Sequence, residues 1–113
     1  MVRAYKKRYI LFRLISEENQ LTKNKVRKAI YECSQHLFGI FGLSQANLDF
    51  LEYDEEKKLG ILRCSNKSLD NIRASLAFIQ QLEGERVSLH VLRVSGTIKT
   101  IKNAIRSEKS LEV

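Results

Sequence analysis

The sequence predicts an α+β fold in which one antiparallel sheet is built as a split β-α-β-β-α-β unit and is followed by a C-terminal helix. Three observations carry this prediction. Runs rich in β-branched and aromatic residues alternate with two longer segments whose apolar residues recur every three or four positions. The two central strand candidates are separated only by an acidic turn. The chain has 113 residues, of which 43% are hydrophobic and 29% are charged, and this suits one domain with one core.

The first strand is predicted over residues 8–15, with Ile10, Phe12 and Leu14 on an apolar face and a mixed face opposite. The first helix begins at Thr22, whose hydroxyl can cap the free amides of the first turn. Its apolar face continues at 4-3-4-3 spacing. The residues of that face are Val26, Ile30, Cys33, Leu37 and Ile40. We expect the chain to leave the helix at residues 41–43.

Residues 47–54 and 59–65 are predicted to form a hairpin around the acidic turn at residues 54–58. Its inward-facing residues are expected to be Leu48, Phe50, Leu62 and Cys64. A second helix is predicted over residues 69–83 and ends at Gly84, and the longest strand follows over residues 85–95. Gly96 and Thr97 then open a third helix that reaches about residue 109.

Two crossovers around a central hairpin define the ferredoxin-like arrangement. If both crossovers are right-handed, the strands lie in the order 4-1-3-2 and all neighbours are antiparallel. We therefore expect a single domain over residues 1–113, with a basic arm at residues 1–7 and the C-terminal helix at residues 97–109.

The charges are segregated along the chain. Twenty Lys and Arg residues against thirteen Asp and Glu residues give a formal net charge of +7. Residues 1–28 hold nine cations and two anions, whereas residues 47–60 hold five anions and two cations. Such segregation suggests that one surface binds a polyanion. Charge that serves only solubility is the alternative that composition leaves open.

The predicted topology brings sequence-distant cations together, because the beginning of the first strand lies beside the ends of the third and fourth strands. The turn at residues 95–99 adds a helix N-terminus and two hydroxyls, which suit a phosphate oxygen. A plain helix cap with solvated lysines is the alternative for that turn. The candidate polyanion-binding residues are Lys6, Lys7, Arg8, Arg63, Lys67, Arg93, Ser95, Thr97, Lys99, Lys102 and Arg106.

The open face of the predicted sheet is too apolar to face water, so the third helix or another protein is expected to cover it. Tyr9 on this face has no aromatic partner on the third strand, which disfavours recognition of RNA bases by stacking. Phe78 lies on the outer side of the second helix. The candidate protein-interface residues are Leu11, Ile15, Ile61, Phe78 and Val91.

Neither a catalytic nor a metal-binding pattern is found in the sequence. His36 and His90 are expected to be structural, and Cys33 and Cys64 to be buried free thiols, because their spacing fits neither a disulfide framework nor a metal site. The acidic turn at residues 54–58 is expected to be a solvated turn or a contact for a basic protein, rather than a cation site. No apolar run is long enough for a membrane span, and no signal-peptide cleavage site follows the basic N-terminal residues, so a cytoplasmic location is expected.

Four segments, taken in order, resemble the archaeal ribonuclease P protein component 2 family. They are KRYI at residues 7–10, GILRC at 60–64, IRASLA at 72–77 and SGTIK at 95–99. The resemblance extends over residues 6–106. It implies an RRM-like subunit of a ribonucleoprotein endonuclease that removes 5′ leaders from precursor tRNA.

The resemblance also implies the partners. In that family the RNA is the catalyst, so we expect no cofactor on the protein and Mg²⁺ only through the RNA component. The expected partners are the ribonuclease P RNA, ribonuclease P protein component 3 and other ribonuclease P proteins, with precursor tRNA contacted indirectly and no membrane. Two alternatives are a ribosomal protein of the same fold and a ligand-sensing regulatory domain of ferredoxin-like topology.

Overall fold

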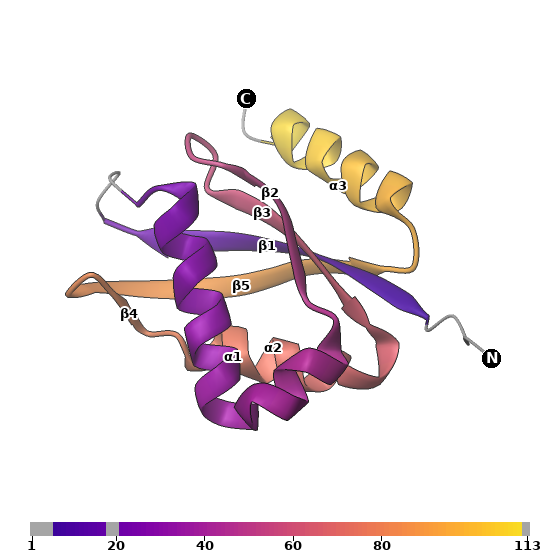
Figure 1. The fold of residues 1–113 in the computed structure, drawn as a ribbon. Helices are drawn as coiled ribbons and strands as arrows, with labels where there is room; N and C mark the ends of the chain where they lie inside the picture. Colours follow the sequence, from indigo (N-terminus) through magenta and orange to yellow (C-terminus); the bar gives the residue numbers. More distant parts are fainter. Residues whose placement is uncertain (1–5, 18–20, 112–113) are drawn as a thin grey trace.

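The structure is a computed structural model that describes residues 6–17 and 21–111. Its elements are β1 (Lys7–Ser16), α1 (Lys23–Ala46), β2 (Asp49–Asp54), β3 (Leu59–Ser65), the 3-10 helix η1 (Asn66–Ser68), α2 (Leu69–Phe78), β4 (Gln81–Leu82), β5 (Glu85–Ser95) and α3 (Ile98–Leu111) (Figure 1). Most of the predicted basic arm lies outside the described residues, and Lys7 already belongs to β1.

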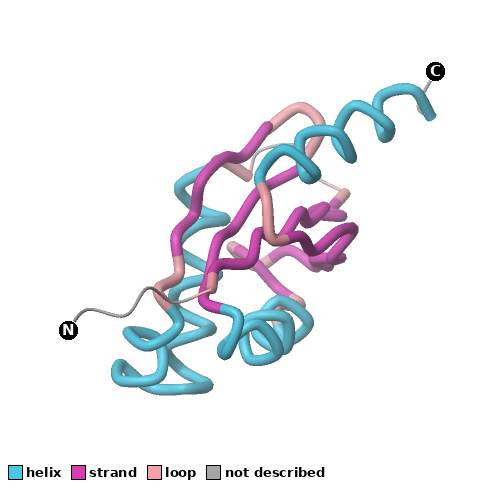
Figure 2. The backbone as a smooth tube through the Cα atoms, turned by 90° about the vertical axis from the view of Figure 1, so that its right-hand side faces the viewer, coloured by secondary structure: helices cyan, strands magenta, loops and turns pink. Residues whose placement is uncertain are grey.

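The strands form one antiparallel sheet in the order β2-β3-β1-β5-β4. Since β5 is the predicted fourth strand, the predicted order 4-1-3-2 and the ferredoxin-like fold are confirmed, with the two-residue β4 added at the edge. Helices α1 and α2 cover one face, and α3 lies on the opposite face (Figures 1 and 2). Within the described residues, no helix is both long and apolar enough to span a membrane.

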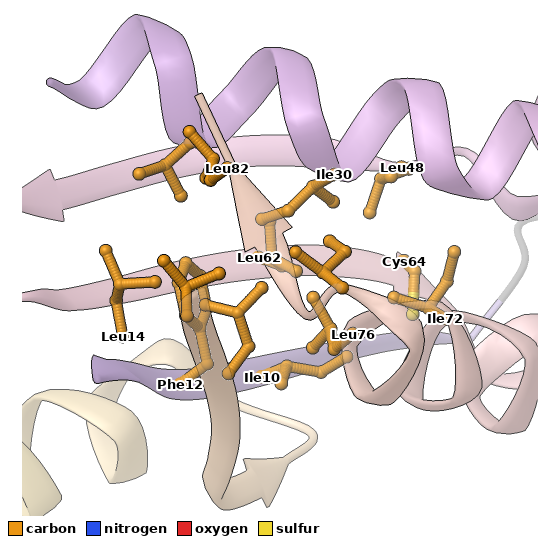
Figure 3. Packing of buried hydrophobic residues seen from close by; sticks show 14 of the residues in the cluster. Ile10, Phe12, Leu14, Ile30, Leu48, Leu62, Cys64, Ile72, Leu76 and Leu82 are labelled. Carbon is orange, nitrogen blue, oxygen red and sulfur yellow. The ribbon is translucent and has the colours of Figure 1, made fainter. Parts of the chain in front are cut away.

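The main core lies between the sheet and the two helices α1 and α2. The predicted apolar face of β1 is fully buried there, and so is the inner set of the β2–β3 hairpin apart from the half-buried Phe50. Figure 3 shows these side chains interleaved with Ile30 of α1 and with Ile72 and Leu76 of α2. The alternation of apolar residues along the strands and their spacing in the helices therefore predict this core correctly.

Helix α1 departs from the prediction beyond Leu37. Thr22 caps it as expected, since its hydroxyl accepts a hydrogen bond from the backbone N–H of Lys25 at 3.4 Å. Gly39 then adopts φ 74° and ψ 173°, which is accessible only to glycine, and kinks the helix before it continues to Ala46. The kink turns Ile40 out of the core, leaving it 73% exposed, so its predicted place on the apolar face is wrong.

Helix α2 ends at Phe78, five residues before the predicted end at residue 83. Glu83 and Gly84 both have positive φ, 55° and 81°, and form a tight turn that pairs β4 with the beginning of β5. Leu82 is only 5% exposed in this arrangement. Pairing and burial therefore outweigh the local helix-like pattern.

Helix α3 covers the other sheet face, which is the first of the two predicted alternatives. Ile101 is fully buried against Leu11, Leu59 and Ile61. Leu11 and Ile61 are therefore buried, which corrects their prediction as protein-interface residues. Ile15 remains 47% exposed.

Val91 also lies elsewhere than predicted. Val91 continues the alternation of Val87 and Leu89, so it pairs with Phe12 and packs in the main core. The register of β1 and β5 shifts only after Val91, at Leu92, so that Arg93 pairs with Leu11. The single extra residue changes the face to which the following side chains point. The prediction of Val91 as an interface residue on the open face is therefore wrong.

Gly60 is required by the aromatic ring packed over it. A Cβ atom at this position would overlap the ring of Phe12, its partner across the strands. We expect Gly60→Ala to lower the free energy of unfolding by about 1–3 kcal/mol, as overpacking does in other cores. Chemical denaturation measures this. Gly96→Ala is the matched control, because its Cβ meets only Arg8 at an ordinary 3.5 Å; equal stability of the two variants contradicts the prediction.

Candidate nucleic-acid interface

One edge of the sheet gathers the beginning of β1 and the ends of β3 and β5. Lys7 is opposite Ser65, and Tyr9 is opposite Arg63 on one side and Ser95 on the other. The backbone N–H of Asn66, which follows β3, donates to the carbonyl oxygen of Lys6 at 2.7 Å. In Figure 1 this edge is on the right, where the chain passes from β5 into α3. The predicted convergence of the three strand ends is therefore confirmed.

We call this edge the basic rim. It is defined by the predicted residues Lys6, Lys7, Arg8, Arg63, Lys67, Arg93, Ser95, Thr97 and Lys99. Lys67 is in η1 directly after β3, and Lys99 is in the first turn of α3. Lys67, Arg93 and Lys99 are exposed. The structure thus places cations from three separate parts of the chain at one border of the sheet.

The turn between β5 and α3 lies against Arg8. A terminal nitrogen of the Arg8 guanidinium is 3.5 Å from the point where a Cβ atom on Gly96 would lie, so the glycine leaves the turn backbone open beside a cation. The backbone N–H of Thr97 donates to the Ser95 hydroxyl at 3.2 Å. The Thr97 hydroxyl accepts a longer hydrogen bond from the N–H of Thr100, at 3.5 Å, in the manner of a helix cap.

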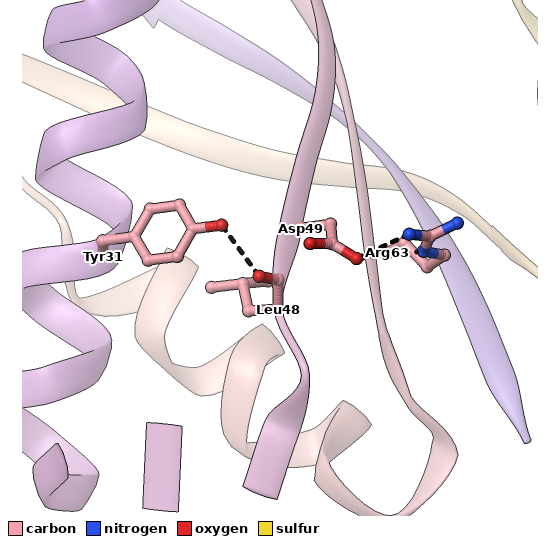
Figure 4. Close-up of polar contacts among 4 residues, drawn as sticks. All are labelled: Tyr31, Leu48, Asp49 and Arg63. Carbon is pink, nitrogen blue, oxygen red and sulfur yellow. Dashed lines mark hydrogen bonds and ion pairs between the residues drawn. The ribbon is translucent and has the colours of Figure 1, made fainter. Parts of the chain in front are cut away.

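Arg63 is held across the sheet by an acidic partner. Its Nη2 and Nε atoms donate to Oδ2 of Asp49 at 2.6 and 3.2 Å (Figure 4). Hydrogen bonds raise the pKa of the Arg63 guanidinium above its usual value. The hydrogen bond to Asp49 has the largest effect, and the hydrogen bond to Tyr9 has the second largest. Directly before β2, the carbonyl oxygen of Leu48 accepts a hydrogen bond of 2.8 Å from the hydroxyl of Tyr31, which ties the start of β2 to α1.

Lys102 and Arg106 are not on the rim. Helix α3 rises about 1.5 Å per residue, so it carries them along the sheet toward the β2–β3 hairpin. There Lys102 Nζ lies 3.0 Å from Oε1 of Glu52. Both cations line a depression of about 500 Å³ together with Lys23 and Lys57. Sequence reasoning missed Lys23 and Lys57, because their proximity to α3 depends on how that helix docks.

The acidic turn has a structural role that the sequence did not predict. The carboxylate of Glu55 accepts a hydrogen bond of 2.9 Å from the backbone N–H of Lys23, at the start of α1. Asp54 accepts from the N–H groups of Glu56 and Lys57 within the turn, at 3.0 and 3.2 Å. These carboxylates therefore complete a helix N-terminus and a tight turn. Among the described residues, no group of His, Cys, Asp and Glu is placed to hold a metal ion.

Cys64 is a buried free thiol as predicted, whereas Cys33 is only partly buried, which corrects its prediction as a buried thiol. Burial raises the pKa of Cys64 to about 11, and burial also raises the pKa of Cys33, whose thiol donates to the carbonyl oxygen of Ser75 at 3.4 Å. Raised pKa values keep both groups protonated at neutral pH, which disfavours a nucleophilic role. His36 is exposed on α1, and His90 forms a hydrogen bond with Ser88 at 2.8 Å.

Fold and rim together define a class: an RRM-like α+β domain whose sheet is covered by its own C-terminal helix and whose edge suits phosphate groups. The model of the Rpp14/Pop5 family matches residues 8–106, and the chain belongs to this family.

Curated relatives carry the name ribonuclease P protein component 2, in agreement with the resemblance seen in the sequence. The Pyrococcus abyssi protein is 36% identical over 103 residues, covering 91% of this chain and 86% of the relative. The Methanosarcina mazei protein is 38% identical over 94 residues, covering 83% and 78%. Among solved structures, a chain of the cryo-EM structure of yeast ribonuclease MRP matches with a TM-score of 0.67 and 15% identity over 97% of this chain and 96% of that one, which shows the shared fold.

Proposed function

We propose that this chain is an RNA-binding protein subunit of ribonuclease P and supports its RNA in the endonucleolytic removal of 5′ leaders from precursor tRNA. The observation that carries the proposal is the convergence of Arg8, Arg63 and Lys99 on one edge of a domain whose relatives are ribonuclease P proteins. Fixed cations neutralise phosphates where RNA strands crowd together and replace diffuse counterions. Contacts of this kind recognise backbone shape and read few bases.

The chemical step is assigned to the RNA component, with Mg²⁺ bound through the RNA and no cofactor bound by the protein. The protonated state of both thiols and the structural use of the acidic turn support this division of labour. In this scheme the rim lowers the Mg²⁺ concentration at which the RNA folds, and it takes no part in bond cleavage.

Protein partners are assigned to a different surface. Phe78 of α2 is 65% exposed, and Ile40 and Phe41 beyond the kink of α1 are 73% and 76% exposed. These side chains extend from the helices on the sheet face opposite to α3, and they suit contact with ribonuclease P protein component 3 or another subunit. Precursor tRNA is contacted only through the assembled particle, which we place in the cytoplasm.

Reconstitution tests the function. The chain, with and without component 3, is added to ribonuclease P RNA, and cleavage of precursor tRNA is measured as Mg²⁺ is lowered. We expect the wild-type chain with component 3 to shift the Mg²⁺ requirement downward, and Lys28→Ala, which removes a cation of α1 paired with Glu32, to behave as wild type. Absence of any shift in either mixture overturns the proposal, and binding to ribosomal RNA in its place identifies the ribosomal alternative.

A further inference from the structure

A row of polar side chains crosses the sheet beside the start of α3. Asp49, Arg63, Tyr9 and Ser95 occupy successive strands in the paired positions of β2, β3, β1 and β5. The Arg63 side chain is only 28% exposed and that of Asp49 is 46% exposed, so the ion pair is partly shielded from solvent. This geometry fixes a guanidinium at the rim rather than leaving a mobile cation there.

We infer that Asp49 is a positioning residue for RNA binding, which rests on the proposed function: it orients Arg63 so that the guanidinium meets an RNA phosphate without further ordering. The guanidinium carries five N–H groups in a planar fork. Asp49 accepts from Nε and Nη2, and Tyr9 engages the same group. Together they occupy only part of the fork, and the remaining donors keep a fixed direction.

The pairing depends on an irregularity in β2. The register of β2 and β3 shifts between Phe50 and Glu52, which places Asp49 opposite Arg63. An uninterrupted register would place Phe50 there instead. The bulge therefore brings the Asp49 carboxylate beside Arg63. This carboxylate lies close to the basic rim, which is the proposed RNA-binding surface.

Electrostatic repulsion between the Asp49 carboxylate and the RNA would have the opposite effect on affinity when Asp49 is replaced by alanine. Removing a negative charge near a polyanion strengthens binding, by about a fewfold at moderate salt because the interaction is screened. Loss of orientation weakens binding, because a freed arginine must be ordered again for each complex. The sign of the change in RNA affinity therefore separates a positioning residue from a repulsive one.

Glu52 supplies a matched control on the same strand. It pairs with Lys102, whose ammonium is a point charge on a flexible chain and needs little orientation. Glu52→Ala is therefore expected to leave RNA affinity unchanged or to raise it. Asp49→Ala is expected to lower affinity about three- to tenfold, which corresponds to much of one phosphate contact.

The experiment measures the affinity of each variant for ribonuclease P RNA at several salt concentrations. Arg63→Ala and Asp49→Ala are combined in a double-mutant cycle, and Asp49→Ala is expected to cause no further loss once Arg63 is absent. Arg63→Lys keeps the charge but loses the fork, and it is expected to bind as weakly as Asp49→Ala. Thermal unfolding of each variant identifies losses that come from misfolding, and Asp49→Asn replaces Asp49→Ala if the latter does not fold.

The outcomes separate the two claims. If Arg63→Ala weakens binding whereas Asp49→Ala and Asp49→Asn leave it unchanged or strengthen it, the positioning role is overturned and the proposed function stands. If Arg63→Ala itself binds as wild type, Arg63 takes no part in RNA binding, and both the positioning role and the place of Arg63 on the interface are wrong.

Discussion

Ile101→Asp is expected to release α3 from the sheet and to lower the free energy of unfolding by at least about 3 kcal/mol. Ile101 is fully buried over Leu11 and Ile61, so the substitution removes a large apolar contact and places a charge in a dry interface. Because α3 also carries Lys99, release of the helix is expected to weaken RNA binding as well. The two effects together link the covered sheet face to the interface.

Denaturant unfolding measures the first effect, and nuclear magnetic resonance of residues 98–106 detects a detached helix through chemical shifts that move toward random-coil values. Asn103→Asp is the matched control, because it adds the same charge at an exposed position of the same helix. If Ile101→Asp unfolds at the same denaturant concentration as Asn103→Asp, then α3 contributes little to the fold and its docking on the sheet is wrong.

The core was predictable from the sequence because it depends on alternation and helical spacing alone. The burial of Ile10, Phe12 and Leu14 follows from the order of apolar residues within β1, whereas the pairing of Phe50 with Leu62 also requires the register shift between Phe50 and Glu52. The departures have another origin. Shifts of register depend on the twist of neighbouring strands, which no local pattern reports, and the shift between Val91 and Arg93 was therefore not predicted.

For the candidate site, the convergence of the strand ends was predictable from the sequence, but the contacts of individual side chains were not. Convergence of the rim follows from topology, since antiparallel neighbours must place the start of β1 beside the ends of β3 and β5. The ion pairs of Arg63 and Lys102 with β2 were not predicted, because they require the exact register of one strand and the docking of one helix. Tyr9, considered only as a stacking residue, instead hydrogen-bonds Arg63.

Simultaneous replacement of Arg8, Arg63 and Lys99 by alanine is expected to lower affinity for ribonuclease P RNA by roughly two to three orders of magnitude at low salt. Each phosphate contact contributes about 0.7–0.9 to the slope of log affinity against log salt, so three lost contacts reduce the slope by roughly 2–3. At about 50 mM salt, a slope change of this size corresponds to that loss. Titration of labelled RNA at several salt concentrations measures both quantities.

A triple variant of equal charge decides whether position or net charge is responsible. Three exposed cations lie away from the rim: Lys25 and Lys28 near the start of α1, and Arg86 near the start of β5, whereas Ser95 is at the other end of that strand. Their replacement by alanine lowers the net charge equally, but it leaves the rim intact. If binding depends on the rim, the salt slope of this control stays close to that of the wild type. Equal slopes for the two triple variants mean that RNA responds to overall charge, and the edge of the sheet is then no specific interface.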